Sequence, residues 1–269
     1  MKIETILTPA ELPALARRDL REACCVVFDV LRATSTIVTA LHNGATAVVP
    51  VSEIAEALAF KKAESGKRKA ETILLGGERG GVKIRAAQTG GIDFDLGNSP
   101  RECTPEMVRG RTIVSTTTNG TRALRACAGA KTVLAGSFLN LGATAEFIRK
   151  LQPAEVLLVC AGTHEDAALE DALAAGALCE LLETGSLRGD GRTAQRAVPA
   201  KTSDSAEIAR CAWAQAKADV AGAFQTSTNA RRLLAIPELR DDVAFCLQRD
   251  VFPLVARMEA DGAIRRQAA

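Results

Sequence analysis

The sequence predicts an α/β fold, with a mostly parallel or mixed sheet flanked by helices and a helix-rich C-terminal third. Short apolar runs rich in valine, isoleucine and threonine alternate with amphipathic stretches through the first two-thirds of the chain, which is typical of βαβ units. Beyond residue 162 the patterns that follow are helical. The 269 residues are 47% hydrophobic and 25% charged, which suits a globular protein of one large unit or two small lobes.

Each expected element has its own run of residues. The expected strands are short apolar runs, at 3–7, 24–30, 45–51, 72–75, 112–115, 132–135 and 156–160. Expected helices show apolar residues at helical spacing, at 53–65, 120–128, 142–151, 167–183, 205–223, 228–235 and 240–249. A stretch rich in glycine and arginine at 185–199 is the expected connection. We therefore expect a sheet region at 1–184 and a helical region at 185–269 packed on it, or one single domain at 1–269.

Charge and cysteine content exclude several classes. The chain has 34 basic and 32 acidic residues, a net charge of +2, and the basic ones are scattered, so nucleic acid is not an expected partner. No leader pattern and no membrane-spanning apolar run is visible, so we expect a cytoplasmic protein away from membranes. The eight cysteines lie mostly in apolar runs, as buried thiols do. No CxxC occurs and the histidines are His42 and His164, which excludes a zinc site of the usual spacing.

The carboxyl ends of parallel strands open into ligand-binding loops, so the residues after each strand are the candidates for a site. Asp29 ends a buried run and is followed by Arg32 and by the hydroxyls of Thr34 and Ser35. The carboxylate could cap its own turn while Thr34 or Ser35 caps a helix. Alternatively, Asp29 holds a hard metal while Arg32 and the hydroxyls receive an oxyanion. Both roles can coexist.

Paired glycines bracket Glu78 and Arg79 in the next loop. Neither a dinucleotide fingerprint nor a P-loop is present, because no helix follows directly and no GxxxxGK[ST] string occurs. A glycine-rich hairpin with a surface ion pair is one interpretation. We favour the other, in which Glu78 and Arg79 both point into the site.

Two further segments carry polar groups that a site needs. A strand at 112–115 leads into Thr118, Asn119 and a glycine, and then into a helix with Arg122 in its first turn, which together offer several donors to one anion. A structural turn competes with this interpretation. Asp171 lies in a helix of alanine, leucine and glycine, so it is expected to be buried and compensated by a metal or an arginine.

Seven ordered strings in residues 24–253, with a weaker eighth, resemble one family. They are FDVLRATSTI, LLGGERGG, FDLGNSP, STTTNGTRA, GSFLN, CAGT and ALEDALAAGA, followed by the echo DDVAFCLQRDVFP. The chain in these strings resembles the 2-phosphosulfolactate phosphatases, the ComB family of coenzyme M biosynthesis.

The resemblance implies a Mg²⁺-dependent hydrolase that converts (2R)-2-phospho-3-sulfolactate to 3-sulfolactate and phosphate. Its implied metal ligands are Asp29, Glu78 and Asp171. Its implied anion-binding residues are Arg32, Thr34, Ser35, Arg79, Asn98, Asn119 and Arg122, with Thr118 beside them. The implied partner is a small anionic phosphorylated substrate. A homodimer through the alanine-rich helices is left open.

Two hydrolytic routes and two other functions stay open. Water could attack phosphorus directly, with Asp171 as the base and Arg79 neutralising charge, or Asp29 could form an aspartyl-phosphate. We favour direct attack, because Leu31 stands where a haloacid-dehalogenase-type phosphatase has its second aspartate. The other functions are a phosphatase for a different phosphorylated 2-hydroxy acid and a sensor that binds such a metabolite without hydrolysis.

Overall fold

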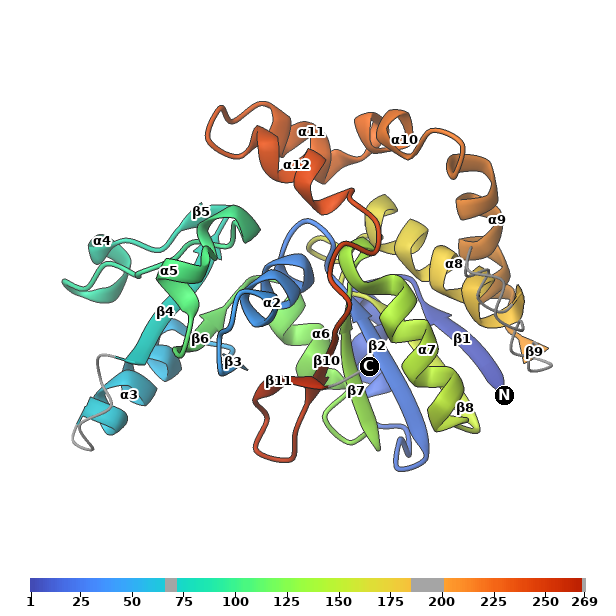
Figure 1. The fold of residues 1–269 in the computed structure, drawn as a ribbon, viewed down its shortest axis with the longest axis horizontal. Coiled ribbons are helices and arrows are strands. Elements are labelled where there is room, and N and C mark those ends of the chain that lie inside the picture. The colour runs from blue at the N-terminus through green and yellow to red at the C-terminus, as the bar shows by residue number, and fades with distance from the viewer. Residues whose placement is uncertain (66–71, 185–200, 268–269) are drawn as a thin grey trace.

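The computed structural model describes residues 1–65, 72–184 and 201–267, which form an α/β structure around one large mixed sheet (Figure 1). The strands are β1 (Lys2–Ile6), β2 (Ala23–Phe28), β3 (Ala47–Pro50), β4 (Ile73–Arg79), β5 (Val82–Lys83), β6 (Thr112–Thr116), β7 (Thr132–Gly136), β8 (Glu155–Cys160), β9 (Lys201–Thr202), β10 (Val255–Met258) and β11 (Ile264–Gln267). Their order in the sheet is β5-β4-β6-β3-β11-β10-β7-β2-β8-β1-β9. The fold class that the sequence predicts is therefore confirmed.

Helices flank this sheet. They are α1 (Leu12–Leu15), α2 (Ala33–His42), α3 (Ile54–Ser65), α4 (Ala86–Thr89), α5 (Pro105–Val108), α6 (Gly120–Ala126), α7 (Leu141–Leu151), α8 (Leu169–Thr184), α9 (Asp204–Ala216), α10 (Val220–Thr226), α11 (Thr228–Leu234) and α12 (Arg240–Cys246). In Figure 1 α7, α8 and α9 lie beside the β1, β2 and β8 strands, while α10, α11 and α12 arch over the upper end of the molecule. No described helix is both long and apolar enough to cross a membrane.

Strand β2 shows why its sequence is a continuous apolar run. All six of its residues are buried. Because neighbouring side chains of a strand point to opposite faces, Val26 and Phe28 enter one core while Cys25 and Val27 enter another. A strand covered by helices on both faces needs apolar residues at every position, and β2 has them. This burial leaves Asp29, the next residue, at the carboxyl edge of the sheet.

The C-terminal hairpin differs from the sequence prediction. We expected only helices after residue 162, but β10 pairs antiparallel with β7, and β11 with β3, so the hairpin joins the two parallel parts of the sheet. Its strands carry Arg257, Arg265 and Arg266. They therefore lack the apolar run by which the other central strands were recognised.

One predicted helix is two separate helices, α9 and α10, in the structure. The expected helix at 205–223 is interrupted, because the Asp219 side chain accepts the amide of Gly222 and begins α10 as an N-cap. The expected connection at 185–199 lies outside the described residues. The division into regions 1–184 and 185–269 stays a prediction.

Candidate active site

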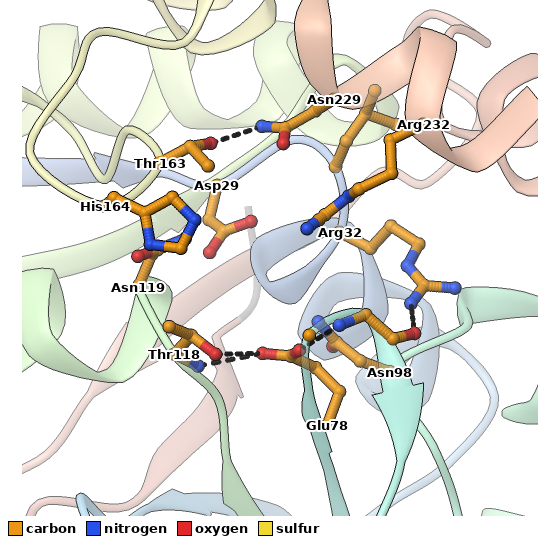
Figure 2. A pocket seen from close by; sticks show the side chains of 13 residues that line it. Asp29, Arg32, Glu78, Asn98, Thr118, Asn119, Thr163, His164, Asn229 and Arg232 are labelled. Atoms are coloured by element: carbon orange, nitrogen blue, oxygen red, sulfur yellow. Dashed lines mark hydrogen bonds between the residues drawn. The ribbon is translucent and has the colours of Figure 1, made fainter.

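A pocket lies where several strand ends meet a C-terminal helix (Figure 2). The space between its atoms, including the part open to solvent, is about 500 Å³. The lining comes from the end of β4, the β4–β5 turn, the loops after β2, β6 and β8, the segment between α4 and α5, and α11. Its residues are Asp29, Leu31, Arg32, Glu78, Gly80, Gly81, Asn98, Thr118, Asn119, Thr163, His164, Asn229 and Arg232. The strands β2 and β8 belong to one parallel part of the sheet, and β4 and β6 to the other. The pocket therefore spans both parts at their carboxyl ends, where α/β sheets bind ligands.

Asp29 presents one free carboxylate oxygen to this pocket. Its Oδ1 accepts the amide of Ala33 at 3.0 Å, whereas no donor of the described residues bonds to Oδ2. A Cβ at Gly120 would lie 2.7 Å from Oδ2, so only glycine lets the start of α6 approach this closely. Burial, assisted by the nearby charge of Glu78 and opposed by the hydrogen bond from Ala33, raises the pKa of Asp29 to about 6.

Glu78 is fixed from two sides. Gly80 and Gly81, with φ of 63° and 84°, form a left-handed turn between β4 and β5 that glycine favours. That turn directs the amide of Gly81 to Glu78 Oε2 at 2.6 Å. On the other side, Thr118 donates its amide and its hydroxyl to Oε1 at 2.8 and 2.9 Å. The carboxylate thus joins the β4–β5 turn to the loop after β6.

Arg32 is the buried cation of the pocket. Its side chain is 3% exposed, and Nη1 donates to Asp242 Oδ2 at 2.6 Å. Nη2 donates to the Gly81 carbonyl at 2.7 Å. Ser99 donates its hydroxyl to the second oxygen of Asp242 at 2.6 Å. The guanidinium therefore links α2, α12 and the β4–β5 turn, and its charge is already balanced by an aspartate.

Helix α11 contributes the outer side of the pocket. Asn229 donates its amide to Thr163 Oγ1 at 2.5 Å and to Glu170 Oε1 at 2.8 Å. Ser227 donates its hydroxyl to the other oxygen of Glu170 at 2.5 Å. Because Glu170 is 1% exposed, this network anchors α11 firmly over the loop after β8. Arg232, one turn further along α11, extends into the pocket in Figure 2.

The sequence of this chain is similar to those of known phosphatases. The sequence profile of the 2-phosphosulpholactate phosphatase family matches residues 7–261. The chain belongs to this family. A probable 2-phosphosulfolactate phosphatase of Thermotoga petrophila is 40% identical over 230 residues, covering 86% of each chain. A protein of the same printed name from Caldanaerobacter subterraneus is 37% identical over 250 residues, covering 92% of each. The family resemblance seen in the motifs is confirmed, and the chain is an enzyme of the phosphatase class.

In this family member, six of the predicted site residues meet at the pocket. They are Asp29, Arg32, Glu78, Asn98, Thr118 and Asn119. They come from four loops that are far apart in the sequence, and strand order alone brings them together. What each of them binds stays a prediction.

Thr34 and Ser35 are predicted residues that lie behind the pocket. Thr34 donates its hydroxyl to the Asp29 carbonyl at 2.9 Å and accepts the Asp29 amide at 3.0 Å. Ser35 donates to the carbonyl of Val30 at 2.8 Å. Both side chains are buried, and neither is among the lining residues. They hold the turn after β2 in place, which supports the Asp29 carboxylate.

Arg79 and Arg122 also lie outside the lining. Arg79 donates to the Thr116 hydroxyl at 3.1 Å and to its own neighbour's carbonyl, that of Glu78, at 2.8 Å. Side chains alternate along β4, so Glu78 and Arg79 point to opposite sides. Arg122 is exposed and forms an ion pair with Glu165 at 2.7 Å.

Asp171 is buried, as the sequence predicts, but both of its carboxylate oxygens accept hydrogen bonds from backbone amides. Its Oδ1 accepts the amide of Val30 at 2.8 Å and its Oδ2 that of Gly162 at 3.0 Å. Burial raises its pKa well above the ordinary value, and the carboxylates of Glu170 and Asp29 raise it further. The side chain is absent from the lining and joins the loops that follow β2 and β8.

The pocket suits one hard divalent ion held by few protein ligands. Within residues 1–65, 72–184 and 201–267, no group of three or more His, Cys, Asp or Glu side chains is arranged to hold a metal. Mg²⁺ needs only one or two carboxylates, because it keeps most of its waters. Asp29 and Glu78 are two buried carboxylates that line one cavity and repel each other. Ligating carboxylates are usually held by further hydrogen bonds, as both are here. Asp29, with one oxygen that no described donor occupies, and Glu78 are the residues that would hold Mg²⁺, and the ion itself stays a prediction.

The residues that the sequence missed come from the C-terminal third. Asn229 and Arg232 lie in the predicted helix at 228–235, which we expected only to pack on the sheet. Their spacing of three positions puts both on one helical face. The sequence signal that could have found them is this pair of polar residues on one face of the helix. The sequence does not show that this face lies over the pocket, because that depends on where α11 packs.

Proposed function

We propose that this protein is a Mg²⁺-dependent phosphatase that hydrolyses (2R)-2-phospho-3-sulfolactate to 3-sulfolactate and phosphate. The family and the names of its relatives support the reaction class and this substrate. The proposal includes a place in coenzyme M biosynthesis, which depends on this substrate. It also includes a cytoplasmic location.

One observation carries the proposal. Asp29, whose Oδ2 accepts no hydrogen bond from the described residues, lines the same cavity as Glu78, two arginines and several amide and hydroxyl donors. A site that only bound an anion would gain nothing from two carboxylates that repel it. A site that holds a cation against a phosphoester needs both signs of charge. The combination favours phosphoryl transfer over simple binding.

The described side chains can position the substrate. Arg32, Asn98 and Asn119 carry donors that line the pocket, and Arg32 is held rigidly by Asp242 and Gly81. Donors fixed before the substrate arrives stabilise developing charge without reorganising. Asp29 and Glu78 would hold Mg²⁺. When bound, the ion would neutralise the phosphate and lower the pKa of a water.

We assign the proton acceptor to His164 in place of Asp171. The oxygens of Asp171 already accept two backbone amides behind the pocket, whereas the His164 imidazole lines it. His164 has a φ of 57°, a conformation that non-glycine residues adopt rarely and that occurs at active sites among other places. Histidine is the side chain used most often for proton transfer in catalysis. In this scheme water attacks phosphorus directly and its proton moves to the imidazole.

Phosphate release from synthetic substrates tests the proposal. We expect turnover of 2-phospho-3-sulfolactate with Mg²⁺, loss with EDTA, and recovery when excess Mg²⁺ is added. Asp29→Asn should lower kcat at least about 100-fold, as loss of a charge at a phosphoryl-transfer site does. Asp19→Asn is the matched control, because Asp19 is exposed and pairs only with the exposed Arg21.

The substrate is tested by the same assay on related phosphoesters. Faster hydrolysis of another phosphorylated 2-hydroxy acid would contradict the substrate and leave the phosphatase class intact. Binding of these compounds without release of phosphate would contradict the enzyme and favour a sensor. Full activity in EDTA would contradict the metal.

A further inference from the structure

We propose that Arg232 of α11 is the specificity-determining residue that binds the sulfonate group of the substrate. This inference deepens the proposed function and rests on it. It concerns a residue that no sequence motif marked and that the helical C-terminal region contributes. The three charged groups of the substrate must be neutralised by different parts of the pocket, and the structure shows how these parts differ.

The charges of the two lining arginines are not equivalent. Arg32 is buried, and its guanidinium already donates to Asp242 and to a carbonyl. Arg232 is exposed, and within the described residues no hydrogen bond or ion pair joins its guanidinium to another group. A cation without a counter-charge in an anion-binding pocket is free to form a bidentate pair with a ligand. Arg232 therefore supplies the positive charge that the protein itself leaves unbalanced.

Depth in the pocket separates the phosphate from the sulfonate. Asp29, Glu78, Arg32 and Asn98 are all less than 10% exposed, at 8%, 7%, 3% and 8%, and form the floor. The phosphate must lie there, because the carboxylates that would hold the ion are there. Arg232 is exposed and reaches in from the outer helix α11, and its Nη2 would lie 3.7 Å from a Cβ placed on Gly81 of the β4–β5 turn.

The shape of the substrate then selects the sulfonate for Arg232. Its phosphate and carboxylate are attached at or next to one carbon, whereas the sulfonate extends from the other neighbouring carbon through a longer carbon–sulfur bond. With the phosphate on the floor, we place the sulfonate, which has the longer arm, toward the rim and Arg232. The guanidinium fork has the geometry to donate two hydrogen bonds to two sulfonate oxygens.

Helix α11 holds Arg232 in a defined position. Asn229 lies one turn earlier on the same face and is fixed to Thr163 and Glu170. Side chains three positions apart on a helix are neighbours, so this anchor sets the direction from which Arg232 enters. Preorganisation of this kind keeps the entropy cost of binding small.

The test compares two substrates in one pair of variants. The substrates are 2-phospho-3-sulfolactate and 2-phospholactate, which lacks the sulfonate. The variants are Arg232→Gln and the matched control Arg231→Gln, an exposed neighbour on α11 that does not line the pocket. We expect Arg232→Gln to lower kcat/KM for the sulfonated substrate by about 10- to 100-fold, as loss of a charged hydrogen bond does. Its kcat/KM for 2-phospholactate should change less than about twofold, and Arg232→Lys should recover part of the loss.

Two results would overturn the assignment. An equal fall for both substrates would place Arg232 on the phosphate or the carboxylate, and no fall for either would remove it from binding. If the unmutated enzyme releases no phosphate from either compound, the proposed function fails and calorimetry decides about Arg232 by itself. If Arg232→Gln then binds 3-sulfolactate more weakly than the unmutated protein does, while its binding of lactate is unchanged, the result supports a sulfonate subsite at Arg232. Unchanged binding, or none to the unmutated protein, would overturn it.

Discussion

The buried pair of Arg32 and Asp242 offers the sharpest test of how the C-terminal region is coupled to the pocket. Arg32 is 3% exposed and Asp242 0%, so neither charge is solvated. Replacing Asp242 by leucine removes the carboxylate that pairs with the buried guanidinium and leaves the Ser99 hydroxyl without its acceptor. Removal of one member of such a pair costs about 3–5 kcal/mol. The lost hydroxyl bond adds about 1 kcal/mol.

The expected loss is therefore about 4–6 kcal/mol in the free energy of unfolding. For a chain of this size, that lowers the melting temperature by roughly 10–20 °C. Urea titration followed by circular dichroism, with scanning calorimetry, measures both quantities. Asp242→Asn is the matched control, because its amide retains an acceptor for Arg32 and contacts Ser99 without the charge, so its loss should be smaller.

The double variant Arg32→Met, Asp242→Leu separates folding from binding. Apolar residues of similar volume can replace a buried ion pair with little cost, so stability should return close to that of the unmutated protein. Activity should not return, because Arg32 lines the pocket. A loss below about 1 kcal/mol for Asp242→Leu would refute the reasoning, since that is the size of an exposed pair. So would a double variant as unstable as the two single losses added together.

Three further outcomes follow from the same structure. Gly120→Ala should lower both kcat and the free energy of unfolding, because the new methyl would lie 2.7 Å from Asp29 Oδ2 and 2.7 Å from the Cβ of Ala33. Unchanged kcat would contradict the contact with Asp29. Arg122→Gln should alter kcat/KM less than about twofold, because the side chain is exposed and pairs with Glu165; a large loss would place it on the substrate after all. Cys211 alone should react with a thiol reagent in the folded protein, since the other seven cysteines are buried. Burial also raises the pKa of Cys160 well above its ordinary value, so rapid labelling of Cys160 would contradict this prediction.

The chain order of the parallel strands and the loops after them could be predicted from the sequence. Buried strands with helices on both faces need continuous apolar runs, and runs such as that of β2 are visible without a structure. The first polar residue after such a run must lie at the sheet edge. Asp29 was found by that rule, and Glu78 and Asn119 by the motifs at the carboxyl ends of the next strands.

The direction of individual side chains could not be predicted. Glu78 and Arg79 are adjacent, and the strand period sends one to the pocket and the other to Thr116. Asp171 reads as a ligand because it is a buried acid, but two amides from distant loops bond to it. A sequence indicates which residue types surround a buried side chain. It does not show which neighbouring groups form hydrogen bonds with that side chain.

The sequence by itself determined the family, the α/β class and the loops that carry the chemistry, because these depend on local patterns and on motifs in a fixed order. Only the tertiary structure decided that β10 and β11 join the two parts of the sheet, and that α11 and α12 bring Arg232 and Asp242 to the pocket. These contacts join residues about two hundred positions apart, as Arg32 and Asp242 are. Their formation depends on how whole elements pack, which no short window of sequence encodes.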